Sequence, residues 1–252
     1  MTRFASLALA GLMMTAVPAS AQTAASWVGL LPGNMLVAID GQTARVGKPM
    51  AIKGVDGTIV GIDVRPANGK LYALTLSGGL YTLDPKTGMA TLASQLSQGV
   101  NTGLNPVVDF NPVADRLRVL GVDGASYRIN VDSGMVTVDG TLKYDPADAA
   151  AGKAPMVQAG AYSNSFAGTK ETGLYDIDSA LGTFLVQAPP NDGILKTRGA
   201  LGVKLSAPIA FDIVADGTGG NLGYLVLGKS LYTVDIATGK TTKKVRSERP
   251  LR

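Results

Sequence analysis

Short runs of alternating hydrophobic and polar residues recur along the chain, and each run leads into a polar turn. The clearest is GLYTLDPKTGMATL, residues 79–92, in which Leu80, Thr82 and Asp84 alternate with Tyr81 and Leu83. A period of two is typical of a β-strand whose two faces meet different surroundings. The turn that follows, DPKTG, combines the fixed φ of Pro85 with a glycine, Gly88, that accepts a positive φ. Each run therefore predicts a strand, a tight turn and a second strand.

Five copies of this phrase make the chain a repeat protein. The other copies are NMLVAIDGQTARV (34–46), ASYRINVDSGMVTV (125–138), TFLVQAPPNDGILK (183–196) and SLYTVDIATGKTTK (230–243). The turn glycine, replaced by alanine in the first copy, falls at positions 44, 88, 134, 193 and 239, so the spacings are 44, 46, 59 and 46 residues. This is the range of a four-stranded propeller blade. The sequence predicts an all-β fold, a β-propeller of five blades with four antiparallel strands each.

A second hairpin precedes three of the copies and supplies the other two strands of each blade. These hairpins are residues 61–74, 107–120 and 210–227, and residues 160–178 keep the pattern less regularly. The first unit begins near Trp27 and lacks an innermost strand. Either residues 22–26 or the segment after Val245 is expected to fill that place.

The N-terminus predicts a signal peptide. Arg3 precedes an apolar run, residues 4–17, and Ala19-Ser20-Ala21 follows as a cleavage motif. The run is too short to span a bilayer, and an all-β remainder offers nothing against which a core helix could pack. We expect residues 1–21 to be removed, leaving a propeller domain at 22–245, a basic tail at 246–252 and no transmembrane segment. The expected location is the periplasm or the medium.

The net charge of +4 is concentrated at the C-terminus. Six basic residues and one acid, Glu248, lie between Lys240 and Arg252, and without this stretch and Arg3 the chain has 16 basic and 18 acidic residues. A short basic tail can touch acidic surfaces such as lipid phosphates, but a solvated terminus is the simpler interpretation. Nucleic acid is not an expected partner. The expected partner is an unidentified ligand, or a protein or glycan outside the cytoplasm, bound by a monomer.

The chain contains no histidine and no cysteine. A Ser-His-Asp triad, a cysteine nucleophile and an ordinary zinc or copper site are therefore excluded. Any bound metal would have to be a cation that prefers oxygen ligands. No catalytic residue is assigned.

An aspartate recurs at one place in three units, as Asp63, Asp109 and Asp212, each between apolar neighbours. The first strand of a propeller blade usually lines the centre, so these acids would form a partial ring able to hold calcium. The alternative is that each carboxyl accepts hydrogen bonds from backbone amides and fixes the spacing of the blades. We favour the second interpretation and retain calcium as the one cofactor to test.

Three arginines, Arg116, Arg118 and Arg128, are close together in the third unit, beside the acids Asp115 and Asp123. Arginines on strands can clamp an anionic ligand, whereas pairing with nearby acids has only a structural role. Pairing is the favoured interpretation.

Polar residues in the fourth unit are further candidates for ligand binding. The rigid turn PPNDG, residues 189–193, would present Asn191 and Asp192 at a blade rim. The triplet Ser-Asn-Ser around Asn164 interrupts the aspartate pattern and would make the centre asymmetric. A loop at 144–155 accounts for the longest spacing and is expected to be exposed, with one turn of helix.

Several of these phrases together resemble the bacterial family called domain of unknown function 4394. They are GIDVRPANGKLYAL, VVDFNPVADRLRVL, AYSNSFAGT, QAPPNDGIL and AFDI, in this order over nearly the whole expected mature chain. The resemblance implies a secreted or periplasmic propeller-like domain with no assigned activity. It differs in having Ala210 where the family pattern commonly has glycine.

The favoured function is a non-enzymatic binding or interaction module outside the cytoplasm, because the chain lacks most reactive side chains. The alternative is a carbohydrate-active hydrolase that uses the central aspartates, since such enzymes work with two carboxyl groups of different pKa. A quinone-dependent dehydrogenase is suggested by the Leu-Tyr-x-hydrophobic-Asp phrase, but it needs more blades and a tryptophan after each turn, and Trp27 is the one tryptophan here.

Overall fold

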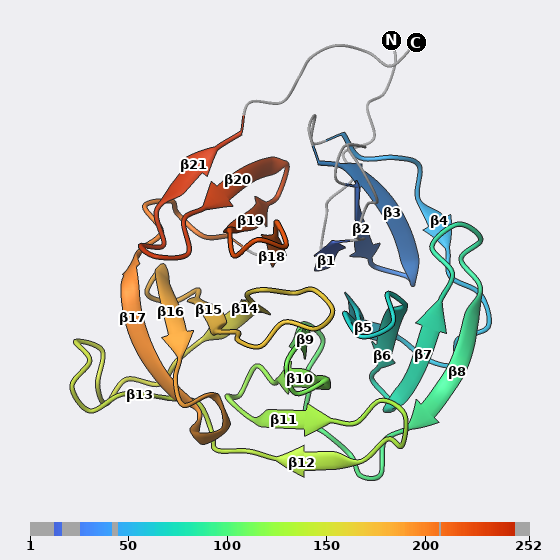
Figure 1. Cartoon of the computed structure of the whole chain (residues 1–252), viewed down its shortest axis with the longest axis horizontal. Helices are drawn as coiled ribbons and strands as arrows, with labels where there is room; N and C mark the ends of the chain where they lie inside the picture. The colour runs from blue at the N-terminus through green and yellow to red at the C-terminus, as the bar shows by residue number, and fades with distance from the viewer. Residues whose placement is uncertain (1–12, 17–25, 42–44, 207, 245–252) are drawn as a thin grey trace.

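Five small sheets surround a central axis as the blades of a propeller (Figure 1). This computed structural model describes residues 13–16, 26–41, 45–206 and 208–244. Each blade is built mainly from consecutive strands, and the blades follow one another around the ring in sequence order. The predicted all-β, five-bladed propeller is thereby confirmed.

From the axis outward, the strands of blade 1 are β1 (Met13–Ala16), β2 (Ser26–Leu31), β3 (Met35–Asp40) and β4 (Met50–Ala51). Those of blade 2 are β5 (Ile59–Val64), β6 (Leu71–Thr75), β7 (Gly79–Leu83) and β8 (Ala90–Gln95). Those of blade 3 are β9 (Val107–Asn111), β10 (Arg116–Leu120), β11 (Ser126–Ile129) and β12 (Val136–Val138). Those of blade 4 are β14 (Val157–Tyr162), β15 (Leu174–Asp178), β16 (Thr183–Gln187), β17 (Ile194–Ala200) and the added β13 (Lys143–Tyr144). Blade 5 has β18 (Ile209–Ala215), β19 (Asn221–Leu227), β20 (Ser230–Val234) and β21 (Thr241–Lys243).

Blade 4 differs from the predicted four-stranded pattern, because β13 pairs in parallel with β17 as a fifth strand. The residues after β13 form a series of turns and contain no helical turn, contrary to the expectation for 144–155. This segment is also partly buried: the side chains of Tyr144 and Ala150 lie in the core between blades 3 and 4. Two buried apolar residues hold the segment against the blade.

The innermost strand of blade 1 is β1, which pairs antiparallel with β2 and contacts β5 and β18 on its two sides. Of the segments expected to take this place, residues 22–25 and those after Lys244 lie outside the described residues, and Ser26 begins β2. Strand β1 comes from the predicted signal peptide. The predicted cleavage site after Ala21 also lies outside the described residues.

Apolar faces of neighbouring blades pack against each other and form the core. One cluster closes the ring between blades 5 and 1, where Trp27 lies against Tyr224 with ring centroids 4.4 Å apart and Leu231 packs beside them. Each fully buried large apolar side chain contributes about 1.5–3 kcal/mol. The core is therefore distributed around the ring, and each blade depends on its two neighbours.

The repeated turn glycine joins each blade to the one before it. The carbonyl oxygens of Gly88 and Gly134 accept the N–H groups of Lys53 and Ser97, which follow the outermost strands of the preceding blades, and that of Gly193 accepts the N–H group of Lys143 on β13. All three glycines have a positive φ, and a Cβ atom on any of them would fall within 2.5 Å of a backbone oxygen in the preceding blade. The spacing of the turn glycines in the sequence is therefore the spacing of the positions at which one blade contacts the next.

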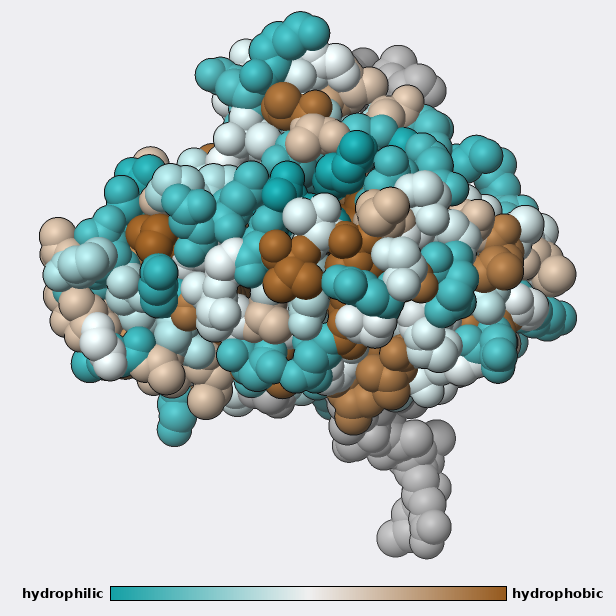
Figure 2. Space-filling view, turned by 90° about the horizontal axis from the view of Figure 1, so that it is seen from below, coloured by the Kyte–Doolittle hydropathy of each residue, from teal (hydrophilic) through white to brown (hydrophobic). Residues whose placement is uncertain are grey.

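In the described ranges the one helical segment is the 3-10 turn η1 (Pro190–Asp192), and no helix there is long or apolar enough to cross a membrane. Seen from the side of blade 3, the surface is largely hydrophilic with separate hydrophobic patches (Figure 2). The outermost strands contribute exposed apolar side chains, including Leu92 on β8 and Val138 on β12. Scattered residues of this kind are ordinary on a protein surface and carry no functional argument.

Candidate functional site

The recurring aspartates lie on innermost strands and connect neighbouring blades. Asp63 on β5 accepts the N–H of Val64 at 2.7 Å with Oδ1, and the N–H of Phe110, on β9 of the next blade, at 2.6 Å with Oδ2. Asp109 on β9 accepts the N–H of Tyr162, on β14, at 2.9 Å. Each of these two side chains is less than 10% exposed. They act as hydrogen-bonded clasps from blade 2 to blade 3 and from blade 3 to blade 4.

Asp212 on β18 makes the same local contact, accepting the N–H of Ile213 at 2.7 Å. Asp63 contacts the N–H of the residue that follows the aspartate of the next blade, and Asp109 contacts the N–H of Tyr162 in blade 4. The residue before Tyr162, Ala161, therefore occupies the aspartate position in blade 4. The pattern is therefore interrupted at Ala161, two residues before the Ser-Asn-Ser triplet to which the sequence pattern assigned it.

The acids around the axis influence one another electrostatically. Burial, followed by the charges of Asp63 and Asp212, raises the pKa of Asp109 well above its usual value. Within the part of the chain that the structure describes, no group of three or more acids, histidines or cysteines is arranged to hold a metal ion. The hydrogen bonds of Asp63 and Asp109 follow the favoured, scaffolding interpretation, and calcium binding at Asp63, Asp109 and Asp212 stays a prediction.

Replacing Asp63 with asparagine is expected to lower the free energy of unfolding by about 1–3 kcal/mol. Both carboxyl oxygens accept backbone N–H groups, whereas an asparagine amide would direct its own NH₂ group at one of them. Urea unfolding of the wild type and Asp63→Asn at equal m-value measures the difference. A stability unchanged by the substitution would show that the clasp contributes nothing.

The arginines of blade 3 are held by an acid and by blade 4. Arg118 is fully buried, and its guanidinium donates to Asp139 at 2.5 Å, to the hydroxyl of Tyr162 at 3.2 Å and to Asn191 Oδ1 at 2.8 Å. Arg128 donates to both carboxyl oxygens of Asp139, at 2.7 and 2.9 Å. The favoured pairing interpretation holds for these two arginines, but the partner is Asp139, which the sequence interpretation did not select.

The remaining sequence candidates have different surroundings. The side-chain oxygen of Asn191 is bonded to Arg118, so the PPNDG turn is fixed against blade 3, while Asp192 beside it is exposed. Asn164 is paired with Asn221 of blade 5 through two hydrogen bonds of 2.7 Å. Arg116 donates to the carbonyl oxygen of Asp115 at 2.9 Å. The structure therefore does not bring the six candidate residues together in one site.

Asp176 on β15 is a buried acid that the sequence interpretation missed. It is fully buried, neither carboxyl oxygen has a hydrogen-bond partner, and burial raises its pKa to about 8. Strand pairing places it opposite Gly160, where a Cβ atom would lie 2.2 Å from Asp176 Oδ1. A glycine thus makes room for the carboxyl. Comparing LYDI (174–177) with LYAL (71–74) would have found it, because Ala73 holds this place in blade 2.

Arg65, also missed, forms another clasp between blades 2 and 3. Its guanidinium donates to both carboxyl oxygens of Asp115, at 2.8 and 2.6 Å, and to both of Asp132, at 2.7 and 2.8 Å. These hydrogen bonds raise the pKa of Arg65 further above its ordinary value. The guanidinium binds two turns of the next blade and is therefore not available to an anionic ligand.

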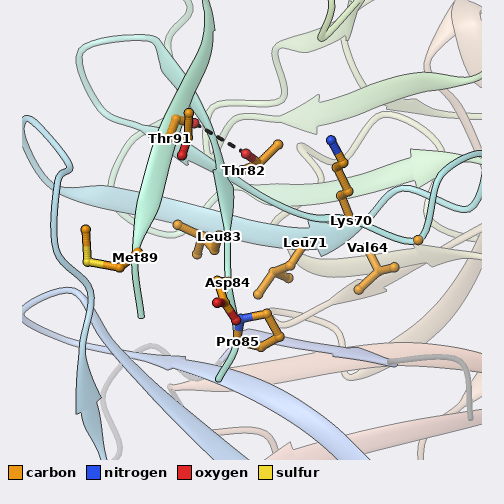
Figure 3. A pocket seen from close by; sticks show the side chains of 10 residues that line it. Val64, Lys70, Leu71, Thr82, Leu83, Asp84, Pro85, Met89 and Thr91 are labelled. Atoms are coloured by element: carbon orange, nitrogen blue, oxygen red, sulfur yellow. Dashed lines mark hydrogen bonds between the residues drawn. The ribbon is translucent and has the colours of Figure 1, made fainter. Parts of the chain in front are cut away.

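A pocket of about 360 Å³ lies on blade 2, beside its two turns (Figure 3). Its apolar lining comes from Val64, Leu71 and Leu83, and Lys70 stands at its edge. Asp84 also lines it, but the N–H of Lys86 and the hydroxyl of Thr87 bind this carboxyl and lower its pKa. An apolar floor with a lysine at the rim can bind a small polar ligand, and no reactive pair of side chains is present among its lining residues.

The model of one protein family, described as Domain of unknown function (DUF4394), matches residues 34–249. The chain belongs to this family. The resemblance noted from the repeat phrases is confirmed, and the family description assigns no activity. No curated protein matches the sequence.

One solved structure with a TM-score above 0.5 supports the fold alone. A structural genomics protein of unknown function from Bacteroides thetaiotaomicron is 17% identical, with a TM-score of 0.54 over 96% of this chain and 60% of its own. The computationally designed Ika8 protein is 13% identical, with a TM-score of 0.41 over 94% of this chain and 63% of its own. YCF48 bound to D1 peptide is 12% identical, with a TM-score of 0.44 over 95% of this chain and 82% of its own. The DUF4394 chain thus spans about 60% of the length of the first two proteins.

Proposed function

We propose that this DUF4394 protein is an exported binding module without catalytic activity. The observation that carries the proposal is the use of its recurring acids. Asp63 and Asp109 are buried and accept backbone N–H groups of the next blade, so they serve the scaffold. The chain also has no histidine and no cysteine with which to build another reactive centre. Among the described residues, the blade 2 pocket and the loops around the ring are accessible to a ligand.

Glycan hydrolysis is the second candidate, and one observation favours it. The pKa of Asp109 is raised beside the charge of Asp63, and a glycosidase needs one protonated and one ionised carboxyl group. Both groups are buried, however, and a substrate must reach them. Burial, followed by the neighbouring acids, accounts for the raised pKa of Asp109 without any catalytic role.

Assays on a panel of soluble and insoluble polysaccharides separate the two candidates. We expect the wild type to release no reducing ends from any polysaccharide. If one of the polysaccharides is a ligand, we expect the protein to co-sediment with it when it is insoluble, or to melt at a higher temperature in its presence when it is soluble. A ligand at about 100 times its Kd adds roughly 2.7 kcal/mol to stability. Cleavage that disappears in Asp109→Asn would reject the binding module in favour of the hydrolase.

Export is tested by expressing the full chain in a bacterial host and measuring the mass of the protein outside the cytoplasm. The proposal expects a chain that begins at Gln22. A protein that stays in the cytoplasm with its first 21 residues would reject this part of the proposal. Because a signal peptide acts before folding, this measurement is independent of the binding assays.

A further inference from the structure

We propose that the place of β1 in blade 1, once the signal peptide has been removed, binds an extended strand from another exported polypeptide. We call this place the β1 slot and define it by its neighbours: β2 on one edge, and β5 and β18 on either side. The inference rests on the proposed export and cleavage, and it assigns a partner class to the proposed binding module.

The β1 slot is one of five equivalent innermost positions around the axis. The others hold β5, β9, β14 and β18, and Figure 1 shows β1 close to the axis beside β2. Met13 to Ala16 pair there with Leu30 to Trp27 in antiparallel register. All four of these residues fall within the apolar run of the predicted signal peptide. Cleavage after Ala21 would therefore remove an entire strand from the blade.

Without β1, one edge of β2 loses its hydrogen-bond partners. With β1 in place, Trp27, Val28 and Leu30 are each less than 10% exposed, so removal of β1 also uncovers apolar surface beside this edge. Backbone N–H and C=O groups among apolar side chains are less well hydrated than on an open surface, so losing their strand partners is unfavourable. An incoming strand restores these hydrogen bonds, which is the physical basis of binding by strand addition.

The mature chain cannot supply this strand from its own N-terminus. If it begins at Gln22, four residues precede β2, which starts at Ser26. A four-residue strand and the shortest hairpin turn together require about six residues. The remaining segment is too short to fold back along β2.

The C-terminal segment is also a poor occupant. Strand β21 is the outermost of blade 5, three strand spacings of about 4.8 Å from β18. Part of the C-terminal segment would therefore be needed to cross blade 5 before it could pair with β2. Residues 245–252 include Pro250 and the charged residues Arg246, Glu248, Arg249 and Arg252. Proline cannot donate to the ladder, and unpaired charges are costly to bury. A second polypeptide is therefore the better donor.

The chemistry of the partner follows from the slot. The cluster on one side of β2 contains Trp27, Leu31 and Ala210, so an inserted strand meets apolar side chains there. The register in the structure is four residues long. The partner strand is therefore a short, extended, uncharged and largely apolar segment that runs antiparallel to β2.

The test uses the exported and cleaved protein, with a labelled peptide of residues 11–18, GLMMTAVP, as the probe; two lysines are added for solubility. Two control peptides carry N-methyl groups, either on Met13 and Thr15 or on Met14 and Ala16. Successive N–H groups of a strand point to opposite edges, so methylation of one pair should weaken binding at least about tenfold and the other pair much less. Hydrogen exchange should slow at the β2 amides on the edge that faces the slot when the unmethylated peptide binds. The β2 amides that pair with β3 serve as the internal reference.

Three results would overturn the inference: a cleaved protein that binds no peptide, equal affinities for both methylated peptides, or protection without peptide of the β2 amides on the edge that faces the slot rather than β3. The last would mean that the mature chain fills the β1 slot itself. A protein recovered with residues 1–21 attached would instead reject the export and cleavage on which the inference rests, and would leave β1 in place.

A second variant covers the case in which the cleaved chain does not fold when it is made. A specific protease site inserted after Ala21 allows the full-length chain to fold first and to be cut afterwards. We expect the labelled peptide to exchange into the cut protein and not into the uncut one. Failure to exchange after cutting would contradict the inference without involving export.

Discussion

Replacing Asp176 with leucine is expected to stabilise the protein, and to do so more at pH 8 than at pH 5. The carboxyl is fully buried with no hydrogen-bond partner, at a place where blade 5 has Leu225 and blade 3 has Val119. Leucine has the same number of side-chain heavy atoms as aspartate, and Gly160 leaves room beside it. The substitution therefore exchanges an unsatisfied acid for an apolar group of similar shape.

The pH dependence follows from the pKa of Asp176, which burial raises from 3.8 to about 8 in the folded protein. Between these values the folded state holds a proton on Asp176 that the unfolded state releases. The contribution of Asp176 to the free energy of unfolding is therefore most favourable below pH 3.8 and becomes less favourable as pH rises towards 8. One pKa unit corresponds to about 1.36 kcal/mol, so the penalty grows by up to about 4 kcal/mol from pH 5 to pH 8. Asp176→Leu removes this part of the pH dependence.

Urea unfolding of both proteins at pH 5 and pH 8 measures the effect. The matched control is Asp178→Leu, two residues further along β15. Asp178 accepts the hydroxyl of Tyr144 at 2.6 Å and the N–H groups of Met156, Ala180 and Leu181, so its loss should destabilise the protein. Destabilisation by both substitutions at both pH values would show that Asp176 has a partner in solution.

Replacing Gly134 with alanine is expected to lower the free energy of unfolding by more than about 3 kcal/mol. Gly134 has a φ of 72°, and a Cβ atom would lie 1.9 Å from the carbonyl oxygen of Gln95 in blade 2. The turn must move away, which breaks the hydrogen bond from Ser97 N–H to the Gly134 oxygen. Strain in the left-handed region and the loss of a contact between blades then act together.

Gly69→Ala isolates the backbone strain, because Gly69 has a φ of 67° and open space where its Cβ would lie. Its expected effect is about 1–2 kcal/mol. Urea midpoints of the two variants, compared at equal m-value, give the contribution of the contact. Equal losses would show that the repeated glycine serves only the turn and not the joint between blades.

The fold could be predicted because strand alternation and turn chemistry are local and repeat five times. The glycine interval located blades 2 to 5 correctly, while its first marker, position 44, lies outside the described residues. Its physical reason, the contact with the preceding blade, became visible in three dimensions. Strand β13 was not foreseen, since its parallel pairing with β17 depends on residues 51 positions away, as in Lys143 and Ile194. The pairing of residues 13–16 with β2 was also not foreseen, because the apolar run that contains them was interpreted as a signal peptide, which stays a prediction.

The candidate site could be predicted only in part. The recurrence of Asp63, Asp109 and Asp212 on innermost strands could be seen in the sequence, and the hydrogen bonds of Asp63 and Asp109 to the next blade follow the favoured interpretation. Arg65 and Asp139 were missed because their partners depend on how blades and turns come together. Asp176 carried a readable signal, an acid at a position that is apolar in blades 2, 3 and 5, and aligning the second strand of each unit would have revealed it.

The most direct test of the scaffolding role is the melting temperature of the purified protein with calcium and then with excess chelator. If Asp63, Asp109 and Asp212 serve the backbone of the ring, the two melting temperatures should agree. A calcium-dependent rise of several degrees that is lost in Asp109→Asn would contradict the account, because it would show that these acids bind a ligand.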